Sequence, residues 1–230
     1  MRTGVFGVAM FLLSAVIAAA QVDKPTLSCT IQDAGVAAPG PFPQPGSAGE
    51  SARLRQAPRG AKRVGKHELR INWSAGVQTF RDKPPYNASL DGVQWSYCGY
   101  SSAAGMHLLG KRDAGLFTGV LLNEKTGAVH PGGQEVWYSP NGRYYLASEQ
   151  PDGQDGPTLK VFRSNGGLVW KGYGGILATD GTSVVADLVG VRWNDQDQVV
   201  MEVVLPNGKH QLETLTQHAG SWEWLPKIAH

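Results

Sequence analysis

The stretch Val136–Trp170, VWYSPNGRYYLASEQPDGQDGPTLKVFRSNGGLVW, decides the fold of this chain, because it reads as two β-hairpins in series. The first hairpin turns at Ser139–Gly142 and the second at Asn165–Gly167, and short apolar segments flank both turns. Asparagine and glycine favour hairpin turns because both residues tolerate a positive φ. The stretch therefore predicts antiparallel β-structure, and the sequence shows no sustained helical period elsewhere.

Related segments recur along the chain. V-W-Y-S-P-N-G at Val136 corresponds to V-R-W-N-D-Q-D at Val191 and, more loosely, to V-Q-W-S-Y at Val93. The second hairpin has counterparts that begin at Leu69, Thr118 and, weakly, Gln211. Spacings of about 40 to 55 residues, with four short strands per unit, are typical of propeller blades. The sequence therefore indicates about three full units and one extra hairpin.

The turn Ser139-Pro140-Asn141-Gly142 resembles the S-P-[DN]-G turn of bacterial β-propeller repeats, over roughly Val93 to Pro226. The resemblance implies binding of proteins, peptides or small ligands through loops at one end of the blades. Two departures stand out: the last unit lacks Ser-Pro-Asn-Gly, and the first contains an insertion at Gly99–Gly105.

The fold class predicted is all-β, with repeated antiparallel four-strand units in a small or incomplete β-propeller. Closed propellers need at least four blades, so a two-sheet β-sandwich or an open barrel is the alternative. Exposed sheet edges invite aggregation, so some form of closure is expected. We expect burial between sheets for the tryptophans in matching strand positions, which are Trp95, Trp137, Trp170, Trp193, Trp222 and Trp224.

Three segments are expected along the chain. Residues 1–20 read as a secretory signal peptide, with Arg2, an apolar run at Val5–Ala19 and small residues before the cleavage site. An uncleaved N-terminal anchor is the alternative. Residues 68–230 form a single β-repeat domain with no further apolar run long enough to span a bilayer. The predicted location is the periplasm or the exterior of the cell.

Residues 21–67 are rich in proline, glycine and alanine and are interpreted as a disordered linker. Its second half is basic, and two interpretations stay open: a solvated linker, which is favoured, or a contact with an anionic surface. The net charge of +2 gives no reason to expect nucleic acid. The basic residues are Arg53, Arg55, Arg59, Lys62, Arg63, Lys66 and Arg70.

The two cysteines of the chain predict a Cys29–Cys98 disulfide in an oxidising compartment, with two free thiols as the alternative. Catalytic patterns are sparse. Gly99–Ala103 approaches a G-x-S-x-G nucleophile elbow around Ser101 but lacks the last glycine. No histidine or cysteine spacing fits a metal site, and no cofactor is expected. Carboxylates for glycoside hydrolysis are available, but the sequence does not single out a pair of them. The candidates are Glu124, Glu135, Glu149, Asp155 and Asp187.

The function predicted is that of an exported, non-enzymatic β-repeat protein that binds a protein or an envelope polymer. The alternative is a cell-envelope hydrolase that uses Ser101 or a carboxylate pair on an ester or glycan. The enzymatic status stays open, and the sparse catalytic residues favour a binding protein. Possible binding loops carry Tyr100, Ser101, Tyr138, Tyr173, Asp152 and Asp155.

Overall fold

The computed structural model describes residues 25–29, 43–84, 92–150, 157–173, 176–177, 184–205, 207–218 and 221–225. The predicted signal peptide and the loop with Asp152 and Asp155 lie outside these residues. Within the described ranges, no helix has the length and apolar character needed to cross a membrane.

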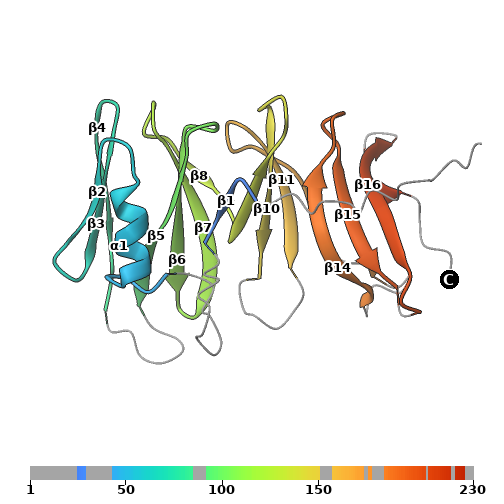
Figure 1. Cartoon of the computed structure of the whole chain (residues 1–230), viewed down its shortest axis with the longest axis horizontal. Coiled ribbons are helices and arrows are strands. Elements are labelled where there is room, and N and C mark those ends of the chain that lie inside the picture. The colour runs from blue at the N-terminus through green and yellow to red at the C-terminus, as the bar shows by residue number, and fades with distance from the viewer. Residues whose placement is uncertain are drawn as a thin grey trace, which may run out of the picture.

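Two sheets form the N-terminal half of the described chain (Figure 1). The first sheet has the order β2-β3-β4, with β2 at Ala61–Val64, β3 at Glu68–Trp73 and β4 at Gly76–Arg81. The second sheet is the meander β5-β6-β7-β8, with β5 at Val93–Ser101, β6 at Met106–Asp113, β7 at Leu116–Asn123 and β8 at Val129–Pro131.

Two further sheets follow, and in each a very short strand is added to the first strand of a four-stranded meander. In the third sheet, β1 (Leu27–Ser28) pairs with β9 of the meander β9 (Glu135–Tyr138), β10 (Tyr144–Glu149), β11 (Thr158–Arg163) and β12 (Leu168–Tyr173). In the fourth sheet, β13 (Ile176–Leu177) pairs with β14 of the meander β14 (Val184–Trp193), β15 (Val199–Val204), β16 (His210–His218) and β17 (Ser221–Leu225).

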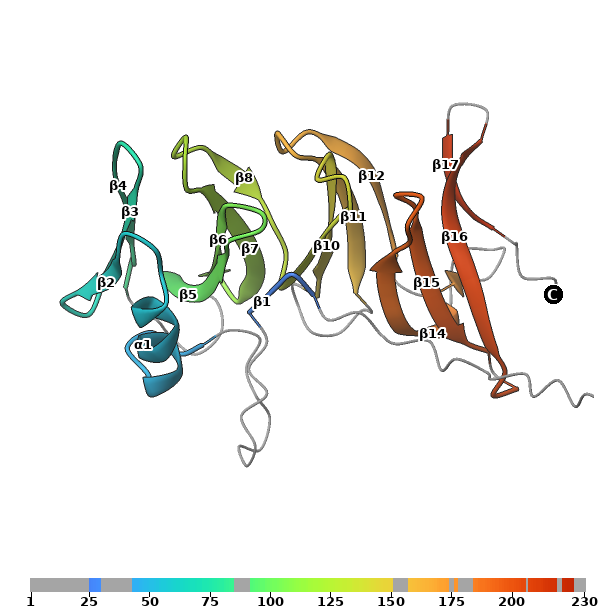
Figure 2. The ribbon, with the colours of Figure 1, turned by 45° about the horizontal axis from the view of Figure 1, so that its top comes forward.

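The four sheets stand in a row, with the first and the fourth at opposite ends (Figures 1 and 2). The predicted all-β class with repeated antiparallel units is confirmed, and the described sheets number four rather than two, with none closed into a barrel. Three four-stranded meanders and a smaller first sheet correspond to the three units and extra hairpin of the sequence. The row is therefore an open series of propeller-like blades.

Three apolar clusters, one at each junction between neighbouring sheets, hold the row together. Leu69, Ile71 and Phe80 of the first sheet pack against Tyr97 and Leu109 of the second. The next cluster lies between the second and third sheets around the cysteines, and the last one between the third and fourth. The expected burial of the six tryptophans is confirmed in part. Trp137 is buried. The other five are only half-buried against these clusters, and they are Trp95, Trp170, Trp193, Trp222 and Trp224.

Turns also join neighbouring sheets. Asn141, in the Ser-Pro-Asn-Gly turn, donates its backbone N–H to Asp197 Oδ1 at 3.1 Å, and its side chain bonds Asp197 Oδ2. Asp197 has a φ of 57°, close to the 68° of Gly142 in the aligned turn. The fourth sheet thus keeps the turn although it lacks the motif, because aspartate tolerates the left-handed region better than most residues.

The prediction of a disordered linker at 21–67 was wrong for much of that range. It contains β1, β2 and the helix α1 (Ala48–Arg55), which packs against β5. Ser47 caps the helix by accepting a hydrogen bond from the Glu50 backbone N–H at 3.2 Å. Glu50 Oε2 in turn accepts the Gly46 N–H at 2.6 Å. This reciprocal arrangement is close to a capping box, which stabilises a helix start without large apolar residues.

Candidate functional site

A groove lies between the edge of the first sheet and the second sheet. Its volume is about 510 Å³, and it is lined by Thr79, Phe80, Arg81, Lys83, Val93, Trp95, Lys111 and Asp113. The chain leaves β4 and returns as β5 through a backbone pairing of Lys83 with Val93. The groove is lined by β4 on one side and by β5 and β6 on the other.

Aromatic side chains form the floor of the groove. The rings of Phe80 and Trp95 are 4.8 Å apart between centroids, with an angle of 50° between their planes. Lys111 Nζ lies 5.9 Å from the centroid of the Trp95 ring and is also ion-paired with Asp113. An ammonium group near an indole face gains electrostatic stabilisation, so Lys111 is held beside the floor.

Positive charge dominates the groove and its surroundings. Three cations line it, on Arg81, Lys83 and Lys111, against the single lining carboxylate of Asp113, and Arg81 is also ion-paired with Glu68 at 3.1 Å. Arg81 and Lys83 are exposed. Residues 48–83 contain nine Lys and Arg and three Asp and Glu, a net charge of +6, whereas the whole chain carries +2. The first sheet is therefore a basic end of a nearly neutral molecule, which attracts anions over the range of a Debye length.

The position of Trp95 depends on an unusual closure of the β5 edge. β5 ends its sheet, and side chains take the place of a neighbouring strand. Asp82 Oδ1 accepts the Trp95 N–H at 2.8 Å, and the Arg63 guanidinium donates to the Trp95 carbonyl. Glu50 Oε1 accepts the Tyr97 N–H at 2.9 Å. An open edge would leave these backbone groups unpaired, so the side chains stabilise β5.

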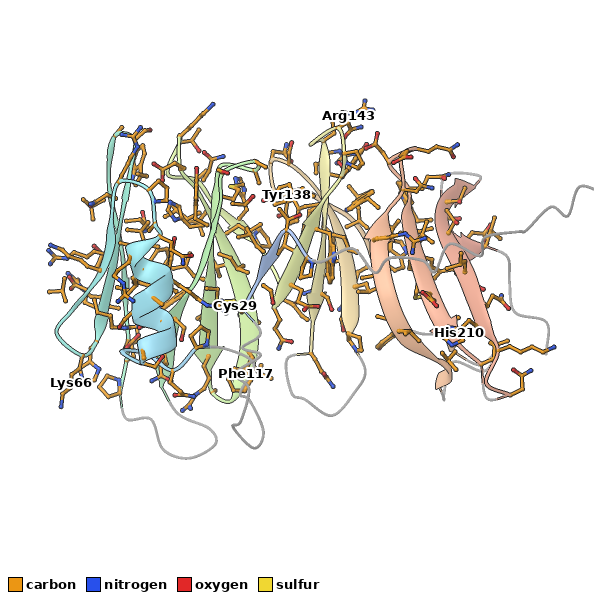
Figure 3. All side chains as sticks on the ribbon, viewed as in Figure 1. Cys29, Lys66, Phe117, Tyr138, Arg143 and His210 are labelled. Carbon is orange, nitrogen blue, oxygen red and sulfur yellow. A yellow bond between two sulfur atoms is a disulfide. The ribbon has the colours of Figure 1, made fainter. Side chains whose placement is uncertain are left out.

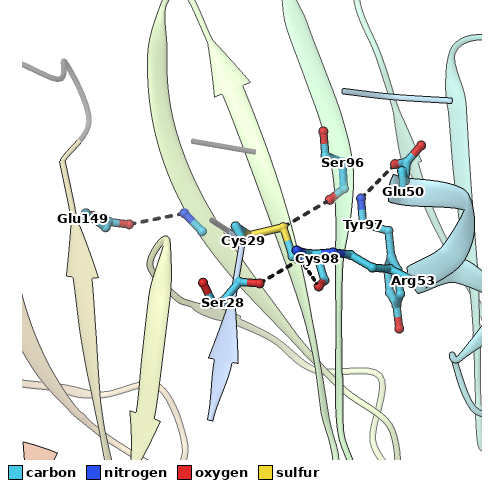
Figure 4. Close-up of a disulfide and its surroundings, with 9 residues drawn as sticks. Ser28, Cys29, Glu50, Arg53, Ser96, Tyr97, Cys98 and Glu149 are labelled. Atoms are coloured by element: carbon cyan, nitrogen blue, oxygen red, sulfur yellow. Dashed lines mark hydrogen bonds between the residues drawn. A yellow bond between two sulfur atoms is a disulfide. The ribbon is translucent and has the colours of Figure 1, made fainter. Parts of the chain in front are cut away.

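Further along the same edge, Arg53 Nη1 donates to the carbonyls of Ser28 and Cys98, at 2.9 Å and 2.6 Å (Figure 4). Arg63 also forms a two-pronged ion pair with Glu50, with both distances at 2.8 Å, and lies 3.4 Å from Asp82. Burial raises the pKa of Asp82, opposed by the Trp95 N–H and by the charge of Arg63. Two of the basic residues assigned to a linker therefore have internal structural roles.

A buried polar chain crosses the junction of the first two sheets. The Tyr97 hydroxyl lies 2.9 Å from His107 Nδ1, and His107 Nε2 lies 2.6 Å from Glu124 Oε2. Burial lowers the pKa of His107, against the hydrogen bond and charge of Glu124. In the neutral imidazole, Nε2 then donates to the carboxylate and Nδ1 accepts from the hydroxyl. Arg59 Nε lies 2.7 Å from the other oxygen of Glu124 as an ion pair.

The surroundings of Tyr97, His107 and Glu124 indicate a structural role for these three side chains. Tyr97 and His107 have no exposed surface, and burial raises the pKa of the Tyr97 hydroxyl. A substrate therefore has no direct access to either group. The three side chains satisfy one another inside the junction, as buried polar groups must.

The predicted disulfide is confirmed: Cys29 and Cys98 are bonded, with 4.7 Å between their Cα atoms (Figure 4). The bond fastens β1, which covers the edge of β9, to β5. The Cys29 N–H donates to the Gln134 carbonyl at 2.7 Å, which extends the β1–β9 pairing.

The residues proposed for binding loops lie apart in the fold. Tyr100 is half-buried on β5, with its ring 4.8 Å from that of His107. Ser101 is buried, and its hydroxyl accepts the Ala104 N–H at 3.3 Å, which stabilises the β5–β6 turn. Tyr138 lies on β9 near β1 (Figure 3) and packs on Tyr145. Tyr173 is exposed at the end of β12.

Other chemistry considered from the sequence finds little support among the described side chains. Glu124 is engaged with His107, and Glu149 is ion-paired with Lys160 in a different junction. Burial raises the pKa of Glu135, which lies on β9. In the part of the chain that the structure describes, no group of three His, Cys, Asp or Glu is placed to hold a metal ion.

The sequence did not single out the groove, because its residues come from three strands. Trp95 and Lys111 pair across β5 and β6, and Phe80 of β4 meets them only when the first sheet packs on the second. A partial signal was present, since Arg81 and Lys83 closely follow the aromatic residue Phe80 in the sequence. Comparison of the chain with family models, with curated proteins and with solved structures gives no match.

Proposed function

We propose that this chain is an exported, non-enzymatic binding protein that takes an acidic segment of another protein into the groove beside β4. The observation that carries the proposal is the pairing of an aromatic floor with three cations at the basic end of the molecule. Aromatic and cationic side chains are favoured anchors at protein interfaces. The disulfide and the N-terminal apolar run support an oxidising, exported setting.

A protein segment fits the groove better than a compact ligand. The groove runs beside β4, and Arg81 and Lys83 in its lining are exposed. Apolar side chains of a peptide can cover Phe80 and Trp95, while its carboxylates approach the cations. A purely anionic polymer would use the cations and leave the aromatic floor uncovered.

The hydrolase alternative is disfavoured by the surroundings of Ser101. Its hydroxyl is engaged with the Ala104 N–H in a tight turn, and it lies on the strand face opposite to that of His107. A nucleophilic serine needs a base within hydrogen-bond reach. Turnover of an ester substrate that disappears in Ser101→Ala would overturn the non-enzymatic assignment.

Binding is tested by fluorescence anisotropy with a labelled eight-residue peptide of alternating glutamate and valine, beside a lysine–valine peptide of equal length. We expect micromolar binding of the acidic peptide only, weakened at high salt because its charges are screened. Lys83→Glu combined with Lys111→Glu should weaken binding at least about tenfold, since several charge contacts of up to ~1 kcal/mol are reversed.

The matched control reverses the same number of charges away from the groove. Lys62 and Lys66 are exposed on β2 and on the turn after it, where Figure 3 labels Lys66 at the margin of the first sheet. The Lys62→Glu, Lys66→Glu double variant should stay within about threefold of the parent protein, because it changes only the long-range field. Equal losses in both double variants, or tighter binding of the anionic polysaccharide alginate than of the peptide, would refute the proposal.

A further inference from the structure

The outer edge of β4 borders the groove, and its backbone groups have a definite direction. In an antiparallel pair, residues alternate between those that bond their partner strand and those that point their N–H and C=O away. Trp73 pairs with Gly76 across a two-residue turn, so Gly76, Gln78 and Phe80 bond β3. Thr79 and Arg81 therefore direct their backbone groups away from β3.

Three hydrogen bonds beyond the end of β4 confirm this alternation. The Asp82 N–H donates to the His67 carbonyl at 2.8 Å, as expected for a residue in phase with Phe80. Lys83 is in phase with Arg81 and bonds away from β3, because it exchanges both backbone hydrogen bonds with Val93, at 2.7 Å and 3.0 Å. Lys83 and Val93 thus already form one hydrogen-bonded pair on the side of β4 that faces away from β3, at one end of the groove.

The ladder stops after this pair within the described residues. Thr79 and Arg81 line the groove, and in the sheet order β4 has β3 as its one neighbour. The first strands of the other three sheets have their edges covered, since side chains bond the edge of β5 and short strands pair with β9 and β14. β8, β12 and β17 also end their sheets, and β4 differs from them in having the cationic, aromatic groove beside it.

We propose that the acidic segment binds as an added β-strand, bonded through its backbone to Thr79 and Arg81. This inference rests on the proposed function and specifies its ligand as an extended segment. Side chains of an added strand alternate between two faces. One face lies over Phe80, Trp95 and Lys111, and the other lies beside Arg81 and Lys83. The ligand is therefore a short segment in which acidic and apolar residues alternate.

The alternation is tested with two peptides of equal composition. The alternating glutamate–valine peptide should bind at least about tenfold tighter than a block peptide with four glutamates followed by four valines. Two further peptides, each with N-methyl groups on the backbone amides of one of the two strand edges, keep every side chain and remove donors. Methylation of the edge that faces β4 should abolish binding, whereas methylation of the opposite edge should change it less than threefold.

The protein side is tested by proline substitution, because Thr79 does not use its N–H within the sheet. Thr79→Pro should weaken the alternating peptide about tenfold. Val77→Pro is the matched control, since the Val77 N–H points outward in the same way but lies outside the groove lining. Circular dichroism reports whether each variant keeps its sheets, and the methylated peptides decide the question if Thr79→Pro does not fold.

The outcomes separate the two proposals. Undiminished binding to Thr79→Pro and of both methylated peptides, with loss in the Lys83→Glu, Lys111→Glu variant, overturns strand addition and leaves the acidic-segment function standing. Equal binding of alternating and block peptides also overturns strand addition. Absence of binding by every acidic peptide overturns the proposed function itself.

Discussion

Arg63 is the residue whose replacement should lower the stability of the first two sheets most. Its side chain is 10% exposed, and its guanidinium contacts Glu50, Asp82 and the Trp95 carbonyl, while the side chains of Glu50 and Asp82 are 0% and 1% exposed. Arg63→Met fills part of the volume and removes the positive charge. Two buried carboxylates are then left facing each other without a cation.

The size of the effect follows from these contacts. Removing one partner of a buried ion pair costs about 3–5 kcal/mol, because the remaining charge is desolvated and uncompensated. Glu50 keeps the hydrogen bonds from Tyr97 and Gly46, which places the expected loss near the lower end, at about 3 kcal/mol. That is a large share of the ~5–15 kcal/mol that stabilises a typical domain.

Urea unfolding followed by tryptophan fluorescence measures the loss. Lys62→Met is the matched control, because Lys62 neighbours Arg63 on β2 but is exposed, and it should change the free energy of unfolding by less than about 0.5 kcal/mol. Adding Glu50→Gln to Arg63→Met should recover part of the stability, because a neutral amide is less costly to bury. A loss below about 1 kcal/mol for Arg63→Met, or no recovery in the double variant, would refute the reasoning.

Two further predictions concern the disulfide and the buried histidine. Replacing both cysteines with serine should lower the free energy of unfolding by up to about 4 kcal/mol, because the bond closes a loop with a sequence separation of 69. Equal urea midpoints for the oxidised protein and the serine variant would contradict this prediction. Burial lowers the pKa of His107, so near the ordinary pKa of histidine the unfolded chain binds more protons than the folded protein, and stability falls as the pH drops through that range. Urea midpoints at pH 7.5 and 5 should therefore differ more for the parent protein than for His107→Gln, and identical differences would show that another group dominates.

The arrangement of the sheets was predictable because its signals are local. Ser139–Gly142 and Asn165–Gly167 specify tight turns, and the alternating residues between them specify strands, so three units and an extra hairpin could be counted. The helix α1 was missed since the surrounding composition suggested disorder. Its local signal, Ser47 followed by Glu50, is a short capping motif. Its burial depends on contacts with β5 that no local pattern shows.

The charged residues were harder to interpret than the apolar ones. Arg53 and Arg63 look like linker residues in sequence, yet both donate hydrogen bonds to the backbone at the edge of β5. An arginine that replaces a neighbouring strand has no periodic signature, because its partner lies at least 30 residues away. The groove was not predicted for the same reason, since only the packing of two sheets brings Phe80 to the Trp95–Lys111 pair.

The bond between Cys29 and Cys98 also determines how the molecule responds to pulling and cutting. The residues between the two cysteines form a covalent ring that contains α1 and the entire first sheet. A force applied to the chain before Cys29 passes through the sulfur atoms directly into β5 and bypasses the ring. A protease that cuts the ring once leaves both fragments attached until the sulfurs are reduced. The sheet that borders the groove is thus mechanically sheltered by a bond that lies outside it.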